Sequence, residues 1–201
     1  NDSLFGGNEN DNILGGKGND SLFGGKGGRT AGGVGNPADL TNLDTLTGGE
    51  DADFFMFVGF TAPAPNTPDL FGTITQFADL GLDLITDFDP TQDKIVLDVS
   101  NQGVTTGGFL QGGLFGQLSV TSVLSVSIVT VADPTGTIAN ASSGQIVFNN
   151  TNGALYFNPQ PGSTQPAFGQ GNPPTAGLFA ILQGTGGATI TTLDTTNFIL
   201  V

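Results

Sequence analysis

Large apolar residues recur every nine positions at the start of the chain, at Leu4, Ile13 and Leu22. Each stands in the middle of a three-residue stretch, and two glycines follow each stretch. The pattern predicts short strands whose central side chain points into a core, joined by glycine turns. It returns around Leu46 and Phe55, and we expect Ile13, Leu22 and Leu46 to form the core.

The second half of the chain shows a different apolar pattern. Residues 118–132 alternate with a period of two and are rich in β-branched side chains, which is typical of strands. Residues 144–157 predict two strands across an Asn-Gly turn. Residues 176–184 and 190–201 predict an apolar strand and a terminal strand.

The N-terminal pattern belongs to a longer phrase, G-G-x-G-x-D-x-U-x, in which U is a large apolar residue. Residues 1–5 end one copy, and two full copies follow at 6–14 and 15–23. Another copy begins at Gly24 and resumes only at Leu43-Asp44, so we predict a surface loop inserted at 28–42. The next copy occupies residues 48–56.

The spacing of the aspartates supports this reading. Asp2 and Asp20 lie eighteen residues apart, which is two copies of the phrase. Asp11 and Asp44, like Asp20 and Asp53, lie thirty-three apart, so one insertion of about fifteen residues keeps both series in step. A Gly-rich flexible linker would predict neither this spacing nor an apolar residue in every copy. We therefore expect two ladders of aspartates on opposite sides of a coil.

The phrase resembles the calcium-binding nonapeptide of RTX (repeats-in-toxin) proteins, including the C-terminal modules of serralysin-like proteases. The resemblance implies an all-β fold, with a parallel β-roll over residues 1–57 followed by a β-sandwich-like C-terminal cap. It also implies about three or more Ca²⁺ ions, held by carbonyl and carboxylate oxygens of the turns. The implied metal-binding residues are Asp2, Gly6, Asn8, Asp11, Gly15, Lys17, Gly18, Asp20, Gly24, Lys26, Gly27, Asp44, Gly48, Asp53 and Asp83. Glu9 and Asp51 replace the fourth-position glycine, where we expect a left-handed backbone.

Residues 58–98 resemble the closing segment of RTX chains, with a second loop insertion at 59–80. If that insertion is twenty-one residues long, Asp83 extends the second ladder. Asp87, Asp89 and Asp93 are either further ligands or parts of an Asp-rich turn around Pro90.

Residues 99–201 resemble the C-terminal cap of the same family, which carries an uncleaved secretion signal for type I export. The family has an Asp-rich turn after its hairpin, where this chain reads YFNPQPG, so we expect no calcium site there.

Composition excludes several classes of function. The net charge is −14, from 18 acidic residues, sixteen of them Asp, against four basic ones, so no basic patch for nucleic acid is expected. The chain has no His and no Cys, which removes imidazole and thiolate catalysis. A carboxylate-pair enzyme such as a glycosidase is disfavoured, since the chain has no Trp and one Tyr. No apolar run is long enough to span a membrane.

The sequence leaves three functions open. The first is a secreted, extracellular or cell-surface structural module that folds on calcium, with no catalytic residue of its own. The second is the C-terminal module of a larger secreted enzyme. The third is a subunit of a surface layer, filament or other homo-oligomer, because the chain after Val99 carries almost no charge. Asn1 stands inside a copy of the phrase, so we expect residues before it.

Overall fold

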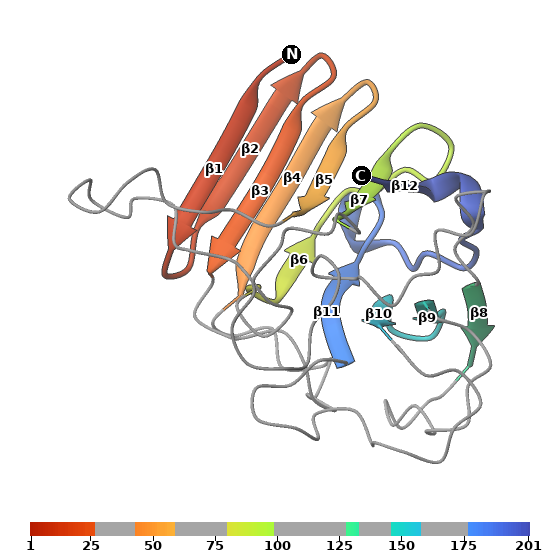
Figure 1. Cartoon of the computed structure of the whole chain (residues 1–201). Coiled ribbons are helices and arrows are strands. Elements are labelled where there is room, and N and C mark those ends of the chain that lie inside the picture. Colours follow the sequence, from red (N-terminus) through yellow and green to blue (C-terminus); the bar gives the residue numbers. More distant parts are fainter. Residues whose placement is uncertain (27–42, 59–79, 99–127, 133–145, 158–176) are drawn as a thin grey trace, which may run out of the picture.

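The computed structural model describes residues 1–26, 43–58, 80–98, 128–132, 146–157 and 177–201. These residues are all-β, with two short 3-10 turns at Thr185–Gly187 and Thr195–Asn197. Strands β1 to β5 lie side by side at one end of the molecule, and β8 lies at the other (Figure 1). Most of the predicted strand at 118–132, the loop at 28–42 and all but Leu80 of the insertion at 59–80 fall outside the described residues.

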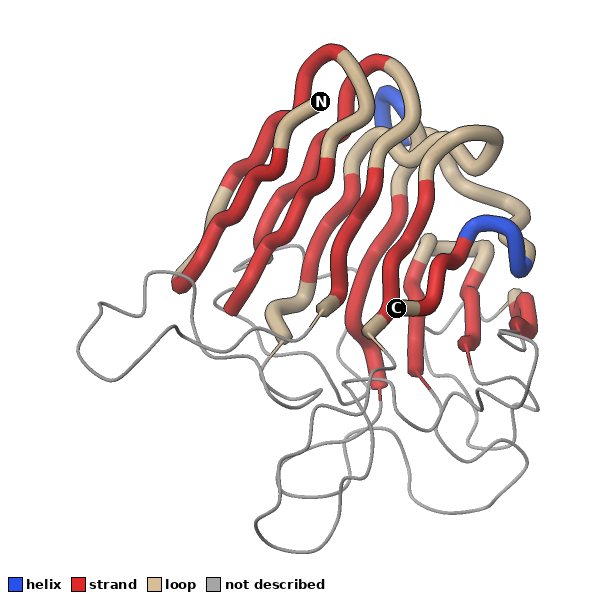
Figure 2. Tube along the Cα trace, turned by 45° about the horizontal axis from the view of Figure 1, so that its top comes forward, coloured by secondary structure: helices blue, strands red, loops and turns tan. Residues whose placement is uncertain are grey.

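Successive strands of the repeat join two sheets in turn, as the tube in Figure 2 shows. The first sheet has five strands, all parallel, in the order β1 (Ser3–Asn8), β3 (Ser21–Lys26), β5 (Phe54–Phe57), β7 (Lys94–Leu97) and β12 (Phe198–Leu200). The second has seven, in the order β2 (Asn12–Lys17), β4 (Asp44–Glu50), β6 (Asp83–Ile85), β11 (Gly177–Leu182), β10 (Ala154–Phe157), β9 (Ile146–Asn149) and β8 (Ile128–Val131). The repeat segment is therefore a parallel β-roll.

The register of the roll keeps equal positions of the phrase opposite each other. Leu22 pairs with Leu4 on one side and with Phe55 on the other. In the second sheet Ile13 pairs with Leu46, thirty-three residues further on. A slip of one residue would turn these side chains to the opposite face, so the apolar pattern fixes the register.

The core lies between the two sheets. Leu22 and Leu46 are fully buried and Ile13 is 8% exposed, which confirms the predicted core. Phe55 and Ile95 of the first sheet belong to the same buried cluster. Packing between the sheets holds the strands together, since short strands of three to seven residues have little stability on their own.

The C-terminal strands extend the two sheets of the roll. β11 pairs in parallel with β6, and β12 pairs in parallel with β7. The predicted hairpin is present as β9 and β10, and Gly153 in its turn has a φ of 76°. The C-terminal part is sandwich-like because it contributes to both sheets. No helix among the described residues is long and apolar enough to cross a bilayer.

Candidate calcium sites

The aspartates of the phrase form two hydrogen-bonded ladders along the roll. The backbone N–H of Asp2 donates to Oδ1 of Asp20 at 2.6 Å, and that of Asp20 donates to Oδ1 of Asp53 at 2.8 Å. Asp53 in turn donates to Oδ1 of Asp93 at 3.0 Å. The structure thus brings the predicted Asp2, Asp20 and Asp53 into one row and adds Asp93 to it.

The second ladder lies on the other side of the roll. The backbone N–H of Asp11 donates to Oδ1 of Asp44 at 2.8 Å. Asp83 is paired with Asp44 in the sheet, so it occupies the next position. The second row therefore joins the three aspartates that the sequence assigned to it.

Each ladder leaves carboxylate oxygens buried without a hydrogen-bond partner. These atoms are Oδ2 of Asp11, Asp20, Asp44 and Asp53, and Oδ1 of Asp83. A buried oxygen without a donor is costly, and five of them in a regular series call for a missing partner. Because anionic oxygens attract cations, the residues fit a metal ion.

Glycines shape the space in front of these oxygens. A Cβ atom on Gly6 would lie 2.7 Å from Oδ2 of Asp11 and 2.5 Å from the carbonyl oxygen of Gly24. A Cβ on Gly15 would likewise lie 2.7 Å from Oδ2 of Asp20, beside the carbonyl oxygen of Gly48. We call these places the glycine cradles. Only a residue without a side chain leaves them open, with carboxylate and carbonyl oxygens converging as calcium requires.

The charge of the buried carboxylates is unfavourable in the metal-free protein. Burial raises the pKa of Asp44 and of Asp93 from 3.8 to about 6, in each case against the lowering effect of backbone hydrogen bonds. Burial, followed by the nearby charge of Asp44, raises the pKa of Asp83 well above its usual value. Burial also raises the pKa of Asp53. A bound cation would reverse these shifts, since it stabilises the ionised form.

Among the described residues no group of three or more acidic side chains is placed to hold a metal ion. The candidate sites therefore combine one or two carboxylates with backbone carbonyls. Such mixed oxygen shells suit calcium, which takes six to eight oxygens, rather than zinc.

The other predicted ligands lie along the turns. Asn8 pairs with Lys26, and Gly18 adopts a φ of 96°. The Nζ atom of Lys17 lies 2.8 Å from Glu50 in an exposed ion pair, so Lys17 has only its carbonyl oxygen to offer a cation. Gly27 lies outside the described residues. The ligand roles of these five residues, Lys26 included, remain predictions.

The Asp-rich turn after β6 serves three different purposes. The carboxylate of Asp87 accepts from the backbone N–H groups of Gly48 and Gly49 at 2.9 and 2.8 Å. Asp89 accepts from Thr91 within its own turn, which lowers the pKa of Asp89. Asp93 accepts from Asp89 and continues the first ladder. The sequence alone favours neither role for Asp93, because an Asp-rich turn around Pro90 accounts for it as well as a ligand does. Forty residues separate Asp93 from Asp53.

The two departures from the phrase carry the expected backbone strain. Glu9 has a φ of 76° and Asp51 a φ of 81°, where glycine is favoured. Asp51 has a compensating contact, because its Oδ2 accepts from the backbone N–H of Gly18 at 3.2 Å.

Replacing Glu9 by glycine is expected to stabilise the calcium-bound protein by about 1 kcal/mol, since it relieves a left-handed residue. Asp51→Gly is the matched control and should gain less, because it also removes the hydrogen bond to Gly18. Urea unfolding at fixed calcium measures both values. Equal gains would show that the Asp51 contact contributes nothing, and a loss for Glu9→Gly would contradict the strain.

Comparison with known proteins agrees with the site. Residues 1–31 match the family model of the RTX calcium-binding nonapeptide repeat (4 copies). The N-terminal segment therefore matches RTX repeats, and the strands that contain those residues form a parallel β-roll.

The chain is also similar to a solved structure, the solution structure of the AlgE6R3 subunit from the Azotobacter vinelandii mannuronan C5-epimerase. The identity is 21%, the TM-score is 0.35, and the match covers 98% of this chain and 77% of that one. The comparison with curated proteins gave no match.

Proposed function

We propose that this chain is an extracellular structural module that folds when it binds calcium after export, and that it then presents or assembles its parent protein. The observation that carries the proposal is the series of five buried carboxylate oxygens without partners. The residues proposed to hold the ions are the ladder aspartates together with the carbonyls of the glycine cradles. A catalytic step, where there is one, belongs to the parent protein.

The location of the module follows from the same chemistry. Calcium sites of extracellular modules have dissociation constants of about 10⁻⁴–10⁻³ M. Such sites would be empty inside a cell and filled outside it. Folding would therefore follow export, and the net charge of −14 would keep the calcium-free chain open before that.

Isothermal titration calorimetry of the full chain tests the proposal. We expect about three or more bound ions, with dissociation constants near 10⁻⁴–10⁻³ M. Asp20→Ala should lose more calcium than Asp2→Ala, because Asp20 is fully buried between two ladder neighbours and Asp2 is exposed. The absence of calcium heat in the unaltered protein would refute the proposal, and equal losses in the two variants would refute the assigned ladder.

Self-association is a second candidate, favoured by the low charge of the chain after Val99, where Asp133 and Asp194 are the charged residues. Strands with few charged side chains are poorly protected against pairing with another chain.

Light scattering in millimolar calcium is expected to show a mass above that of the 20.3 kDa monomer. EGTA should return the protein to a monomer, because the calcium-free chain is expected to lose most of its strands. A monomer at every protein concentration in calcium would rule out assembly and leave the calcium-binding role intact.

A further inference from the structure

In the second sheet, the roll and the C-terminal strands meet at a single short strand. β6 has three residues, and it lies between β4 of the roll and β11 of the C-terminal part. Asp83, its first residue, pairs with Asp44 on one side and with Ala180 on the other. An acidic residue thus stands fully inside the sheet at the place where the two parts of the molecule meet.

The glycine cradle at this joint differs from the regular ones. A Cβ on Gly24 would lie 2.8 Å from Oδ2 of Asp44 and 2.8 and 2.9 Å from the two oxygens of Asp83. Two carboxylates converge here, whereas the cradles at Gly6 and Gly15 combine one carboxylate with one carbonyl. Asp44 is fully buried and Asp83 is 3% exposed. Oδ2 of Asp44 and Oδ1 of Asp83 have no hydrogen-bond partner.

Two like charges buried face to face repel each other and oppose the pairing of their strands. A divalent cation between them would convert the repulsion into a bridge. We propose that Asp44 and Asp83 hold a calcium ion at Gly24, and that occupancy of this joint site docks the C-terminal strands on the roll. The proposal rests on the calcium-binding function proposed above, and it gives this site a task that the regular cradles do not have.

Two leucines next to the proposed site connect the ion to the packing of the C-terminal strands. Leu43 and Leu82 directly precede the two aspartates, and both belong to the second buried cluster of the molecule. That cluster also contains Tyr156 of β10 and Leu178 of β11. An ion that fixes Asp44 and Asp83 would also fix Leu43 and Leu82, and so complete the surface on which the C-terminal strands pack.

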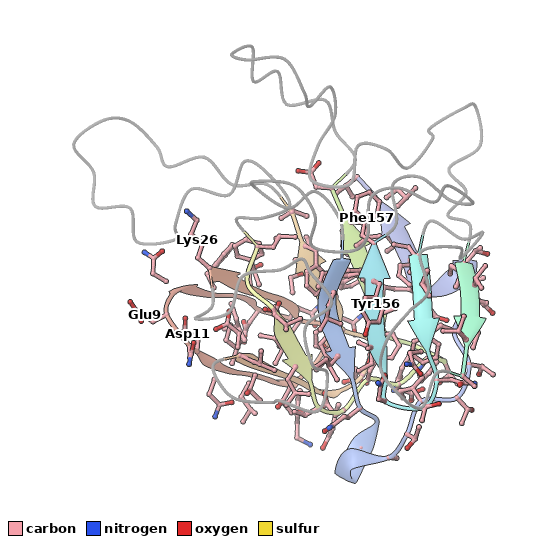
Figure 3. The ribbon with its side chains drawn as sticks, turned by 90° about the horizontal axis from the view of Figure 1, so that it is seen from below. Glu9, Asp11, Lys26, Tyr156 and Phe157 are labelled. Atoms are coloured by element: carbon pink, nitrogen blue, oxygen red, sulfur yellow. The ribbon has the colours of Figure 1, made fainter. Side chains whose placement is uncertain are left out.

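The chain supplies its own reporter for this docking. Tyr156 is the only tyrosine, the chain has no tryptophan, and the Tyr156 side chain is fully buried. Asp11, beside the regular cradle at Gly6, lies toward the N-terminal end of the roll and away from Tyr156 (Figure 3). The near-ultraviolet circular dichroism of Tyr156 therefore reports on the joint rather than on the N-terminal strands.

Gly24→Ala tests the proposal, with Gly6→Ala as the matched control. Each places a methyl group in one cradle without changing a charge, and neither glycine needs a positive φ. Calcium is titrated into the calcium-free full chain while the tyrosine signal is recorded. We expect Gly24→Ala to raise the calcium midpoint of the Tyr156 signal by about tenfold, and Gly6→Ala by less than about threefold, although each loses one bound ion.

A terbium titration gives a second measurement, because terbium occupies calcium sites and is excited through a nearby tyrosine. Asp83 on β6 is two strands from Tyr156 and Asp11 is four, or roughly 10 Å against 20 Å at the usual strand spacing. We expect sensitised emission to fall by about fivefold or more in Gly24→Ala and to stay within about twofold in Gly6→Ala. If Gly24→Ala does not fold, Asp83→Asn and Asp11→Asn provide the same comparison by both measurements.

The outcomes separate this proposal from the wider one. Equal Tyr156 midpoints in the Gly24 and Gly6 variants, with calcium still bound to the unaltered protein, would overturn the joint site alone. A tyrosine signal in the unaltered protein that is the same in EGTA and in calcium, with no calcium bound, would overturn the calcium-binding function itself.

Discussion

In EGTA the full chain is expected to lose most of its β structure, and millimolar calcium is expected to restore it. The calcium-free fold would keep Asp20, Asp44, Asp53, Asp83 and Asp93 almost fully buried in a protein of net charge −14. Three calcium ions carry six positive charges and would bring the net charge to −8. Each site at a hundredfold excess over its dissociation constant adds about 2.7 kcal/mol, so three add about 8 kcal/mol. That equals the whole stability of many domains, which is about 5–15 kcal/mol.

Far-ultraviolet circular dichroism measures this transition, and magnesium is the matched control. Magnesium has the same charge but prefers a small octahedral shell with several waters, so it should not restore the strands at equal ionic strength. A β spectrum that is unchanged in EGTA would contradict calcium-driven folding. Recovery with magnesium would show that charge screening, rather than a site, drives it.

The ladders and the roll core could be predicted because both depend on a local period. The phrase repeats every nine residues, and an insertion shifts the spacing of Asp11 to Asp44 and of Asp20 to Asp53 by the same amount. The burial of Leu22 and Leu46 follows from the same phrase. A period of this kind is visible in the sequence even where an inserted loop interrupts it.

The remaining features depend on contacts that no period encodes. Asp93 joins the first ladder, but it lies ten residues after Asp83, one more than the nine-residue phrase. The repeat alone therefore does not predict its position. The position of Asp83 was predicted, but its convergence with Asp44 at Gly24 depends on how β6 enters the sheet. The pairing of β11 with β6 joins residues nearly a hundred positions apart. The apolar run at 176–184 predicts a strand, but nothing in it predicts which strand it pairs with.

Calcium binding to the folded protein is expected to weaken on acidification from about pH 7 to about pH 5. Burial raises the pKa of Asp44 and that of Asp93 to about 6 in the calcium-free fold, and it also raises the pKa of Asp83 well above its usual value. Calcium must displace the proton from each ligand, so a carboxyl with a pKa of 6 weakens binding by about tenfold at pH 5.

The calcium-free fold should show the opposite trend. Above about pH 6 the buried carboxylates are ionised, and their burial opposes folding in full. In the unfolded chain the same carboxyls have a pKa near 3.8 and ionise without this cost. The penalty falls as the pH drops through 6 and is absent below 3.8. Mild acid should therefore favour residual β structure in EGTA while it weakens calcium binding.

Asp93→Asn and Asp89→Asn form the matched pair for this prediction. Asp93 takes up a proton near pH 6 in the calcium-free fold, so Asp93→Asn should flatten the pH dependence of calcium binding to the folded protein. The Thr91 hydrogen bonds lower the pKa of Asp89, which therefore stays ionised across this range, and Asp89→Asn should leave the dependence unchanged. Calcium titrations by calorimetry at several pH values, in an osmolyte that keeps the calcium-free chain folded, provide the comparison. A dissociation constant that does not change between about pH 7 and about pH 5 would show that the buried ladder carboxyls do not compete with calcium for protons.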